Sequence, residues 1–317
     1  MRLLKVHGSG NLFYLYETSD ENAYDFVQIT KWLCAKENNG GADGLLLVCP
    51  SDVALAKMRV INADGSEASM CGNGLRCVAR YICEKYGVDE AKIETMKAVL
   101  HVQKEASAFE DLPTYSVEIS PVSFNLDTLP MNYNSQQTIE HQIIEEFSPT
   151  ILFTAISVPN PHLIGIVSGH YIRHQSHQFL LANFLNNDNE YCPDGVNVSY
   201  VYPLSEHEIY VRTYERGVGF TNACGTAMTA SALVAYKNGL VQQQEVTVYN
   251  PGGFVKCEVS LGKEIRLRLI GNATVEAEYE LTVAPTFELV PISETGEATQ
   301  YERCKEFVKS KITIYNM

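Results

Sequence analysis

The sequence is poor in positive charge and contains no long apolar run. Its 24 Lys and Arg residues face 38 Asp and Glu residues, which gives a formal net charge of -14. Such a chain repels phosphate backbones and anionic membranes, so we expect neither nucleic acid nor a membrane among its partners. No apolar stretch reaches the length of a membrane span, and the first residues lack the apolar segment of a signal peptide. These absences predict a cytoplasmic protein.

The cysteines do not form the pattern of a disulfide framework. There are nine of them, an odd number, scattered over 317 residues. Reduced thiols are therefore the expectation, and a reactive thiol has to be identified from its surroundings. The remaining composition, 45% apolar and 20% charged, is ordinary for a globular protein, and the length suggests two domains.

Strand patterns dominate the chain, and a few segments have helical spacing. A polar, proline-punctuated stretch at 121–130 is a candidate boundary between two halves. The last residues, from 292 onward, show only a weak helical pattern near 301–309. Strands are predicted at 3–7, 12–17, 44–50, 57–66, 98–120, 151–167 with a break at Pro159-Asn160-Pro161, 196–203, 208–217 and through most of 245–283; helices are predicted at 22–36, 71–86, 175–185 and 224–236.

One short design occurs twice, nearly half a chain apart. Cys71-Gly-Asn-Gly and Cys224-Gly-Thr-Ala each follow a strand and a polar turn, and each opens an alanine-containing helix. A chance match is the alternative interpretation, because the shared Cys-Gly sequence is short. The shared flanking architecture favours two related halves that face each other, each with a thiol at the first turn of a central helix.

A helix N-terminus suits a reactive thiol for two reasons. Its unsatisfied N–H groups and positive partial charge lower the pKa of a thiol and also bind a carboxylate. Two such termini on opposite sides of a cavity could hold an amino-acid carboxylate with its alpha carbon between two sulfurs. One thiolate would remove the alpha proton, and the opposite thiol would deliver another to the far face. Cys71 and Cys224 are therefore predicted to be an acid/base pair.

At these residues the sequence resembles diaminopimelate epimerase. The resemblance extends from His7-Gly-Ser-Gly-Asn11 to about Leu281 and rests on motifs in the family's order and spacing. It implies interconversion of LL- and meso-diaminopimelate without pyridoxal phosphate, another cofactor or a metal, in lysine and peptidoglycan biosynthesis, and usually a homodimer. The motifs are Asn62-Ala-Asp-Gly-Ser-Glu67, Cys71-Gly-Asn-Gly-Leu-Arg76, Asn160-Pro-His162, Gly195-Val-Asn197, Glu215-Arg-Gly-Val-Gly219 and Ala223-Cys-Gly-Thr226.

The resemblance also implies a role for each matching residue. Cys71 and Cys224 would be the acid/base pair, assisted by His162 and Glu215. Gly72-Asn73 and Gly225-Thr226 would hold the carboxylate at the reacting end of the substrate. The distal amino-acid end would be gripped by Asn11, Asn62, Asn160, Asn197, Glu215 and Arg216, with Arg216 as the forked carboxylate partner.

The fold implied by the resemblance is α+β, with two pseudo-symmetric halves. Each half would be a mostly antiparallel sheet or barrel wrapped around a central helix. We expect residues 1–122, completed by a strand near 271–285, to form the N-terminal half, and residues 123–270 to form the C-terminal half. Residues 286–317 would be an extension to which no role is assigned.

Three positions depart from the family pattern. Gly44 stands where many members have a substrate-contacting glutamine, and Leu12 replaces the common aspartate after Asn11. Ala227 replaces the common glycine after Cys224-Gly-Thr. The first two departures could reshape the distal pocket, whereas none of the three touches the reacting pair.

Less specific interpretations stand beside these. Asn160 and His162 could be a capped proline turn, Glu215-Arg216 a surface ion pair, and the seven other cysteines inert core residues. His170, His174 and His177 are spaced so that they could share one helical face. No carboxylate or cysteine completes a recognised metal-binding pattern with them, so we expect no metal. Two alternative functions stay open: a two-cysteine racemase of a proline-like or histidine-like amino acid, and a thiol-disulfide switch that uses Cys71 and Cys224.

Overall fold

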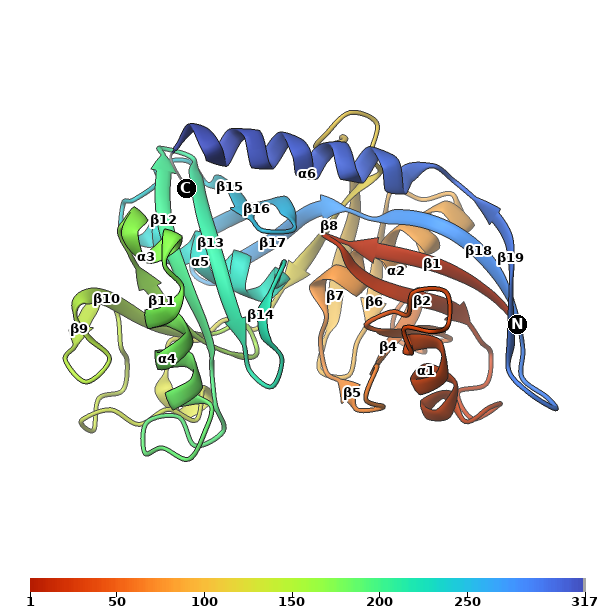
Figure 1. Cartoon of the computed structure of the whole chain (residues 1–317), viewed down its shortest axis with the longest axis horizontal. Helices are drawn as coiled ribbons and strands as arrows, with labels where there is room; N and C mark the ends of the chain where they lie inside the picture. The colour runs from red at the N-terminus through yellow and green to blue at the C-terminus, as the bar shows by residue number, and fades with distance from the viewer. Residues whose placement is uncertain (316–317) are drawn as a thin grey trace. The chain divides into compact units, whose positions relative to one another are not determined.

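Two units of similar size make up the chain, and the chain crosses between them more than once. The computed structural model describes residues 1–315. The first unit contains Met1–Glu118 and Ile270–Lys305, and the second contains Ile119–Leu269 with the chain from Glu306 onward. Figure 1 shows the elements in chain order from red to blue. Within residues 1–315, no helix is both long and apolar enough to cross a membrane.

In the first unit a mixed sheet packs around helix α2. This helix, Gly72–Tyr86, contacts β1, β2, β3, β4, β6 and β7, and it ends at Gly87 in the left-handed conformation that favours glycine. The other elements are β1 (Arg2–Gly8), β2 (Asn11–Glu17), α1 (Phe26–Cys34), β3 (Gly44–Cys49), β4 (Ala56–Asn62), β5 (Glu67–Ala68), β6 (Glu90–Glu94), β7 (Val99–Glu105), β8 (Thr114–Ile119), β18 (Thr274–Thr282) and β19 (Glu288–Glu294).

In the second unit a similar sheet packs around helix α5. This helix, Gly225–Lys237, contacts β10, β11, β12, β13, β15 and β16 and is buried over most of its length. The other elements are η1 (Leu126–Thr128), β9 (Gln142–Ile144), β10 (Ser148–Ser157), β11 (Pro161–Ile166), α3 (Gly169–Arg173), α4 (Ser176–Leu185), β12 (Asn197–Ser205), β13 (Glu208–Glu215), β14 (Gly219–Thr221), β15 (Glu245–Asn250), β16 (Gly253–Leu261) and β17 (Ile265–Asn272).

The pairing pattern of the first unit is repeated in the second. Strand β2 pairs antiparallel with β1 and parallel with β3, and β11 pairs in the same way with β10 and β12. Strand β4 pairs antiparallel with β3 and β5 and parallel with β6. In the same way, β13 pairs antiparallel with β12 and β14 and parallel with β15. The central helix follows the short strand in both units. The internal repeat seen in the sequence is therefore a repeat of topology, and the predicted α+β class with two pseudo-symmetric halves is confirmed.

Buried strands explain the apolar runs in the sequence. All six residues of β3 are buried, and those on one face form a core with residues of β1 and α1 that includes Leu3, Leu33 and Leu45. The second unit has its own core, which includes Phe153, Leu163 and Tyr200. A strand covered on both faces has no polar face, which is why 44–50 reads as a continuous apolar run.

Local patterns misplaced or missed some elements. The helix predicted at 22–36 spans only Phe26–Cys34, because the Asp25 side chain accepts a hydrogen bond from Gln28 N–H and caps the helix there. Short strands β5, β6, β9 and β14 and the one-turn helix α3 were not predicted, since two to five residues carry too little periodicity. The weak helical pattern near 301–309 belongs to a longer helix, α6 (Glu297–Ile314).

Candidate functional site

Cys71 lies at the N-terminus of α2, as the sequence predicted. It occupies the cap position in an extended conformation, and its sulfur accepts a hydrogen bond from Gly74 N–H at 3.4 Å. Gly72 and Asn73 form the buried first turn. The half-buried thiol is therefore held against the helix's free N–H groups, where an anion would also be stabilised.

Asn11 contacts both Cys71 and Asn73. Its side-chain oxygen lies 3.8 Å from the Cys71 sulfur and 3.4 Å from the Asn73 side-chain nitrogen. The amide nitrogen of Asn11 donates to the Asp43 carboxylate at 2.7 Å, and Leu12 N–H donates to the same oxygen at 2.8 Å. Asp43 thus orients Asn11. Sequence reasoning missed Asp43, because 32 residues separate it from Asn11 and no local pattern connects them.

Asn62 lies at the turn between β4 and β5. Its amide nitrogen donates to the Ser66 hydroxyl at 3.0 Å, and its backbone is paired with Gly44 in the adjacent strand β3. A Cβ atom on Gly44 would lie 2.5 Å from the Ile61 carbonyl oxygen. Glycine is therefore required for the close approach of these two strands, and position 44 has no room for a glutamine side chain.

Cys224 occupies the matching position in the second unit, at the N-terminus of α5. Its sulfur lies 3.4 Å from the Thr226 hydroxyl. Burial and the negative charge of Glu215 raise the pKa of Cys224 well above its ordinary value, although the hydrogen bond with Thr226 acts in the opposite direction. A backbone hydrogen bond with Ala227, in the first turn of α5, lowers the pKa of Cys224 as the sequence predicted, but desolvation outweighs it and the net shift is upward.

Glu215 ends strand β13 and forms a hydrogen bond with the Cys224 side chain. Its carboxylate also accepts a hydrogen bond from the Thr221 hydroxyl at 2.6 Å. Thr221 lies in β14, whose residue Gly219 pairs with Glu215. The hairpin therefore fixes the carboxylate beside the sulfur. Thr221 is a second residue that the sequence patterns did not indicate.

His162 is fully buried at the start of β11. Its Nε2 lies 3.1 Å from the Asn160 side-chain oxygen and 3.1 Å from the Thr226 hydroxyl. Burial, helped by the charge of Arg216, lowers the pKa of His162 to about 3. The imidazole is therefore neutral near pH 7 and connects the proline turn to the first turn of α5.

Asn197 and Arg216 lie together on neighbouring strand ends. The Asn197 side-chain oxygen accepts from Arg216 N–H at 2.8 Å, and the guanidinium donates to the Asp194 carbonyl at 2.8 Å. Gly195, with a φ of +71°, has no room for a side chain between Asn186 and Arg216. The exposed guanidinium keeps donors for a further anion.

The structure thus brings the predicted residues into two groups, one in each unit. Gly225 is the first residue of α5 and lies in the chain between Cys224 and Thr226. The first group contains Asn11, Cys71, Gly72 and Asn73, whereas the contacts described for Asn62 are with Ser66 and Gly44. The second group contains Asn160, His162, Asn197, Glu215, Arg216, Cys224, Gly225 and Thr226.

Other candidates from the sequence have ordinary surroundings. Burial raises the pKa of Cys34, Cys77, Cys192 and Cys304 to about 12, as is typical of inert core thiols. His177 contacts the Tyr200 hydroxyl at 2.6 Å, whereas the rings of His170 and His174 lie 4.7 Å apart at a tilt of 47°. Within residues 1–315, no three His, Cys, Asp or Glu side chains gather as metal ligands.

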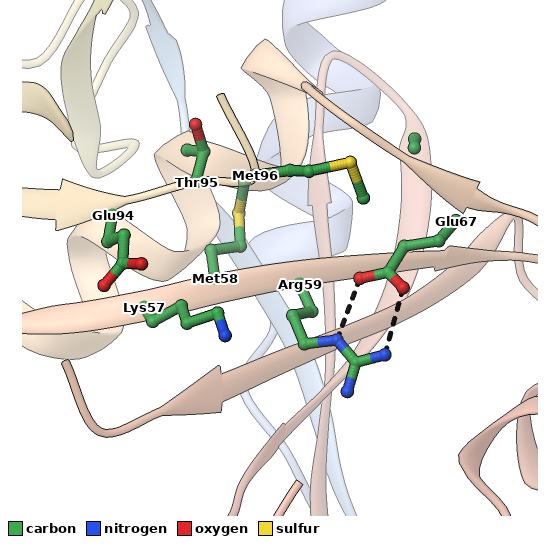
Figure 2. A pocket seen from close by; sticks show the side chains of 8 residues that line it. Lys57, Met58, Arg59, Glu67, Glu94, Thr95 and Met96 are labelled. Carbon is green, nitrogen blue, oxygen red and sulfur yellow. Dashed lines mark hydrogen bonds and ion pairs between the residues drawn. The ribbon is translucent and has the colours of Figure 1, made fainter. Parts of the chain in front are cut away.

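A surface pocket of about 230 Å³ lies in the first unit, around the edge of β4 between β5 and β6. Figure 2 shows the ion pair of Arg59 with Glu67 at its rim. Lys57 and Arg59 also pair with Glu21. The cations of this pocket are thus neutralised by neighbouring carboxylates, and its lining residues include none of the residues predicted for the site.

Solved structures with this fold define a class. A phenazine biosynthesis protein of the PhzF family from Bacillus anthracis has a TM-score of 0.61 at 12% identity, over 89% of this chain and 99% of that one. A probable proline racemase from Agrobacterium radiobacter has a TM-score of 0.61 at 14% identity, over 90% of this chain and 93% of that one. The fold is therefore that of the PhzF and proline-racemase class.

Sequence comparison identifies the family within that class. The sequence model of the diaminopimelate epimerase family matches residues 3–108 and 154–274. The diaminopimelate epimerase of Listeria innocua is 46% identical over 96% of both chains, and that of Enterococcus faecalis is 45% identical over 97% of this chain and 98% of its own. The chain belongs to the diaminopimelate epimerase family and is an isomerase, so the predicted family and enzyme class are confirmed.

Proposed function

We propose that this protein interconverts LL-2,6-diaminopimelate and meso-2,6-diaminopimelate by a cofactor-independent two-base mechanism, in lysine and peptidoglycan biosynthesis. The observation that carries the proposal is the repeated placement of a cysteine at the N-terminus of each central helix, Cys71 on α2 and Cys224 on α5. Membership of the family supplies the substrate.

The two cysteines take different protonation states in this proposal. The raised pKa of Cys224 favours its thiol form, so Cys224 begins as the acid and Cys71 as the base. The Cys71 thiolate takes the alpha proton, and the Cys224 thiol gives its proton to the opposite face of the same carbon. The configuration inverts with no net change in protons, and the roles exchange when the reaction runs backwards.

The backbone N–H groups of the two helix termini stabilise the reacting carboxylate. Gly72-Asn73 and Gly225-Thr226 occupy the first turns, where N–H groups have no partner within the helix. They would bind the carboxylate in its ground state and hold the additional negative charge of the enediolate. His162 positions Thr226 while remaining neutral, and Glu215 keeps the proton on Cys224.

The distal amino-acid end needs partners for two charges, because burying an unpaired charge is costly. Arg216 supplies a forked cation for the distal carboxylate. The side chains of Asn11, Asn62, Asn160 and Asn197 supply further donors and acceptors. This set of polar groups favours diaminopimelate over substrates with a single amino-acid end.

We also propose that the enzyme is a cytoplasmic homodimer that binds no nucleic acid and no membrane. The net charge of -14 supports the exclusion of anionic polymers and surfaces. Sedimentation velocity of the purified protein at several concentrations would test the dimer.

The test of function is isotope exchange. Reduced enzyme in deuterated water, with no added cofactor, is expected to incorporate deuterium at the alpha carbon of diaminopimelate and to interconvert its LL and meso forms. Parallel reactions with proline and histidine are expected to show no exchange. Exchange only with proline or histidine would identify another racemase, and no exchange with any of the three would contradict the proposed epimerase.

A further inference from the structure

The C-terminal helix α6 contacts the loop that carries Asn11. Tyr301 of α6 is buried, and its ring packs edge-on against His7 with centroids 4.5 Å apart. Its hydroxyl forms a hydrogen bond with Ser9. The Ser9 hydroxyl in turn accepts from the Arg76 guanidinium at 2.9 Å, and Arg76 belongs to α2. Tyr301 therefore joins α6, the loop and the helix that begins at Cys71.

The loop has an unusual backbone that needs such support. Ser9 has a φ of +55° and Gly10 a φ of +77°, in the left-handed region that a serine rarely adopts. Ser9 N–H donates to the Asn272 side chain at 2.8 Å, and Gly10 N–H donates to His7 Nδ1 at 3.2 Å. The conformation therefore depends on the position of the His7 ring, which Tyr301 covers.

His7 has to remain neutral for this arrangement, because a protonated Nδ1 could not accept from Gly10. Burial, together with the charges of Arg76 and Lys305, lowers the pKa of His7 to about 3. The facing carboxylate, Glu276, lies 3.8 Å from Nε2 on β18. Arg76, Lys305 and Glu276 thus face the ring, and burial has the largest effect on the pKa of His7.

The backbone of the loop packs closely against α2 at Gly8. A Cβ atom on Gly8 would lie 2.7 Å from the Asn73 carbonyl oxygen and 2.8 Å from the Arg76 guanidinium. Asn11 follows two residues after Ser9 and contacts both Cys71 and Asn73. A displacement of the loop would consequently displace the side chain that contacts the Cys71 sulfur.

We propose that Tyr301 is a positioning residue for the epimerase reaction, acting through His7 and Ser9 to hold the Asn11 loop against the N-terminus of α2. This inference rests on the proposed roles of Asn11 and Cys71. It assigns a function to the C-terminal extension, since Tyr301 lies beyond residue 274, the last residue that the family's sequence model matches.

Glu297 anchors the same helix independently. Its carboxylate accepts two hydrogen bonds from Arg80 of α2, at 2.7 and 2.9 Å, and one from Val275 N–H at 2.9 Å. The start of α6 can therefore stay docked when the Tyr301 side chain is shortened, which allows the local role of the ring to be measured.

The experiment compares Tyr301→Ala, Tyr301→Phe and Val308→Ala. Val308 is as buried as Tyr301 on the same helix but belongs to the second unit, so it controls for a general loss of packing. For Tyr301→Ala we expect kcat to fall about tenfold or more with a smaller change in KM, because the reacting groups are misplaced. Tyr301→Phe keeps the ring on His7 and is expected to restore most of kcat, and Val308→Ala to leave it unchanged.

A second readout does not depend on turnover. The rate of iodoacetamide alkylation at Cys71, measured by peptide mass spectrometry, is expected to rise about threefold or more in Tyr301→Ala because the loosened loop uncovers the thiol. The rate at Cys224 should not change. Failure of wild-type protein to epimerise diaminopimelate would overturn the proposed function, whereas the alkylation rates would still test the positioning.

Three results would overturn the positioning role. The first is a folded Tyr301→Ala variant with wild-type kcat and wild-type alkylation of Cys71. The second is an equal loss in Val308→Ala, which would indicate general destabilisation. The third concerns Tyr301→Phe, which serves as the test if Tyr301→Ala fails to fold. The proposal then requires that Tyr301→Phe shows a small loss of kcat and faster alkylation at Cys71 but not at Cys224. Wild-type kcat together with a wild-type alkylation rate at Cys71 would contradict it.

Discussion

The side chain of Cys224 forms a hydrogen bond with the carboxylate of Glu215 inside the second unit. Cys224 is only 6% exposed, and this burial also disfavours its thiolate form. The pair places a proton acceptor beside a buried thiol and keeps the thiol protonated. Such a thiol is suited to the role of acid that we propose for Cys224.

Replacing Glu215 by glutamine should make Cys224 more acidic. The change removes the negative charge that raises the thiol pKa, so the midpoint of Cys224 alkylation against pH should move to lower pH. Mass spectrometry of the alkylated peptide measures this midpoint. Glu206→Gln, at an exposed position in the same unit, is the control. An unchanged midpoint in Glu215→Gln would show that burial alone sets the pKa of this thiol.

Each reacting cysteine should be individually essential. Cys71→Ala or Cys224→Ala is expected to lower kcat for inversion of diaminopimelate by roughly 10²–10⁴-fold, the usual contribution of a positioned acid or base. Cys83→Ala changes a buried thiol on the same helix as Cys71 and should retain activity. Circular dichroism checks that the variants fold. Near-normal turnover in either site variant would contradict the two-base mechanism.

Asp43 should matter for substrate binding although it is absent from the sequence motifs. Asp43→Ala leaves the Asn11 amide and Leu12 N–H without the acceptor that they share. Loss of hydrogen bonds to a charged group is expected to lower kcat/KM by about 10- to 100-fold. Steady-state kinetics measure the effect, with Asp52→Ala, an exposed position in the same unit, as control. Equal kinetics in both variants would mean that Asp43 does not orient Asn11 in the complex.

Gly44 should tolerate no side chain. Gly44→Ala places a Cβ atom 2.5 Å from the Ile61 carbonyl, so the β3–β4 pair has to separate, at a cost of about 1–3 kcal/mol in the free energy of unfolding. Gly262→Ala meets its nearest atom, the Glu264 carbonyl oxygen, at 3.6 Å and should be close to neutral. Urea denaturation compares the two. If Gly44→Ala were as stable as Gly262→Ala, the strands would have to be more adaptable than this contact implies.

Acid should destabilise the fold through its two buried histidines. His7 and His162 have pKa values lowered from 6.5 to about 3, so only the unfolded chain binds their protons between these values. The stabilisation of the folded state by these neutral histidines is fully present above pH 6.5 and is lost as the pH falls toward 3. At pH 5 the free energy of unfolding is lower by about 2 kcal/mol per histidine. Urea denaturation at pH 7 and pH 5 should show a smaller difference for His7→Gln and for His162→Gln than for the wild type. An identical difference in all three proteins would mean that neither ring stays neutral.

Sequence by itself determined the family, the repeat and the start of each central helix. These features are local: a cap residue, a glycine-rich turn and helical spacing lie within about a dozen neighbouring residues, as at Cys71-Gly-Asn-Gly. Through the family motifs it also named the candidate site residues of both units. The catalytic and binding roles of those residues stay predictions.

Tertiary structure alone decided what surrounds these motifs. Asp43 reaches Asn11 across 32 residues, and the side chain of Asn272 reaches Ser9 across 263, through strand pairings that no local pattern encodes. The raised pKa of Cys224 could not be predicted either, because a thiol at a helix terminus becomes a stronger or weaker acid according to its burial. Depth and neighbouring charge are properties of the packed fold, and they raise the pKa of Cys224.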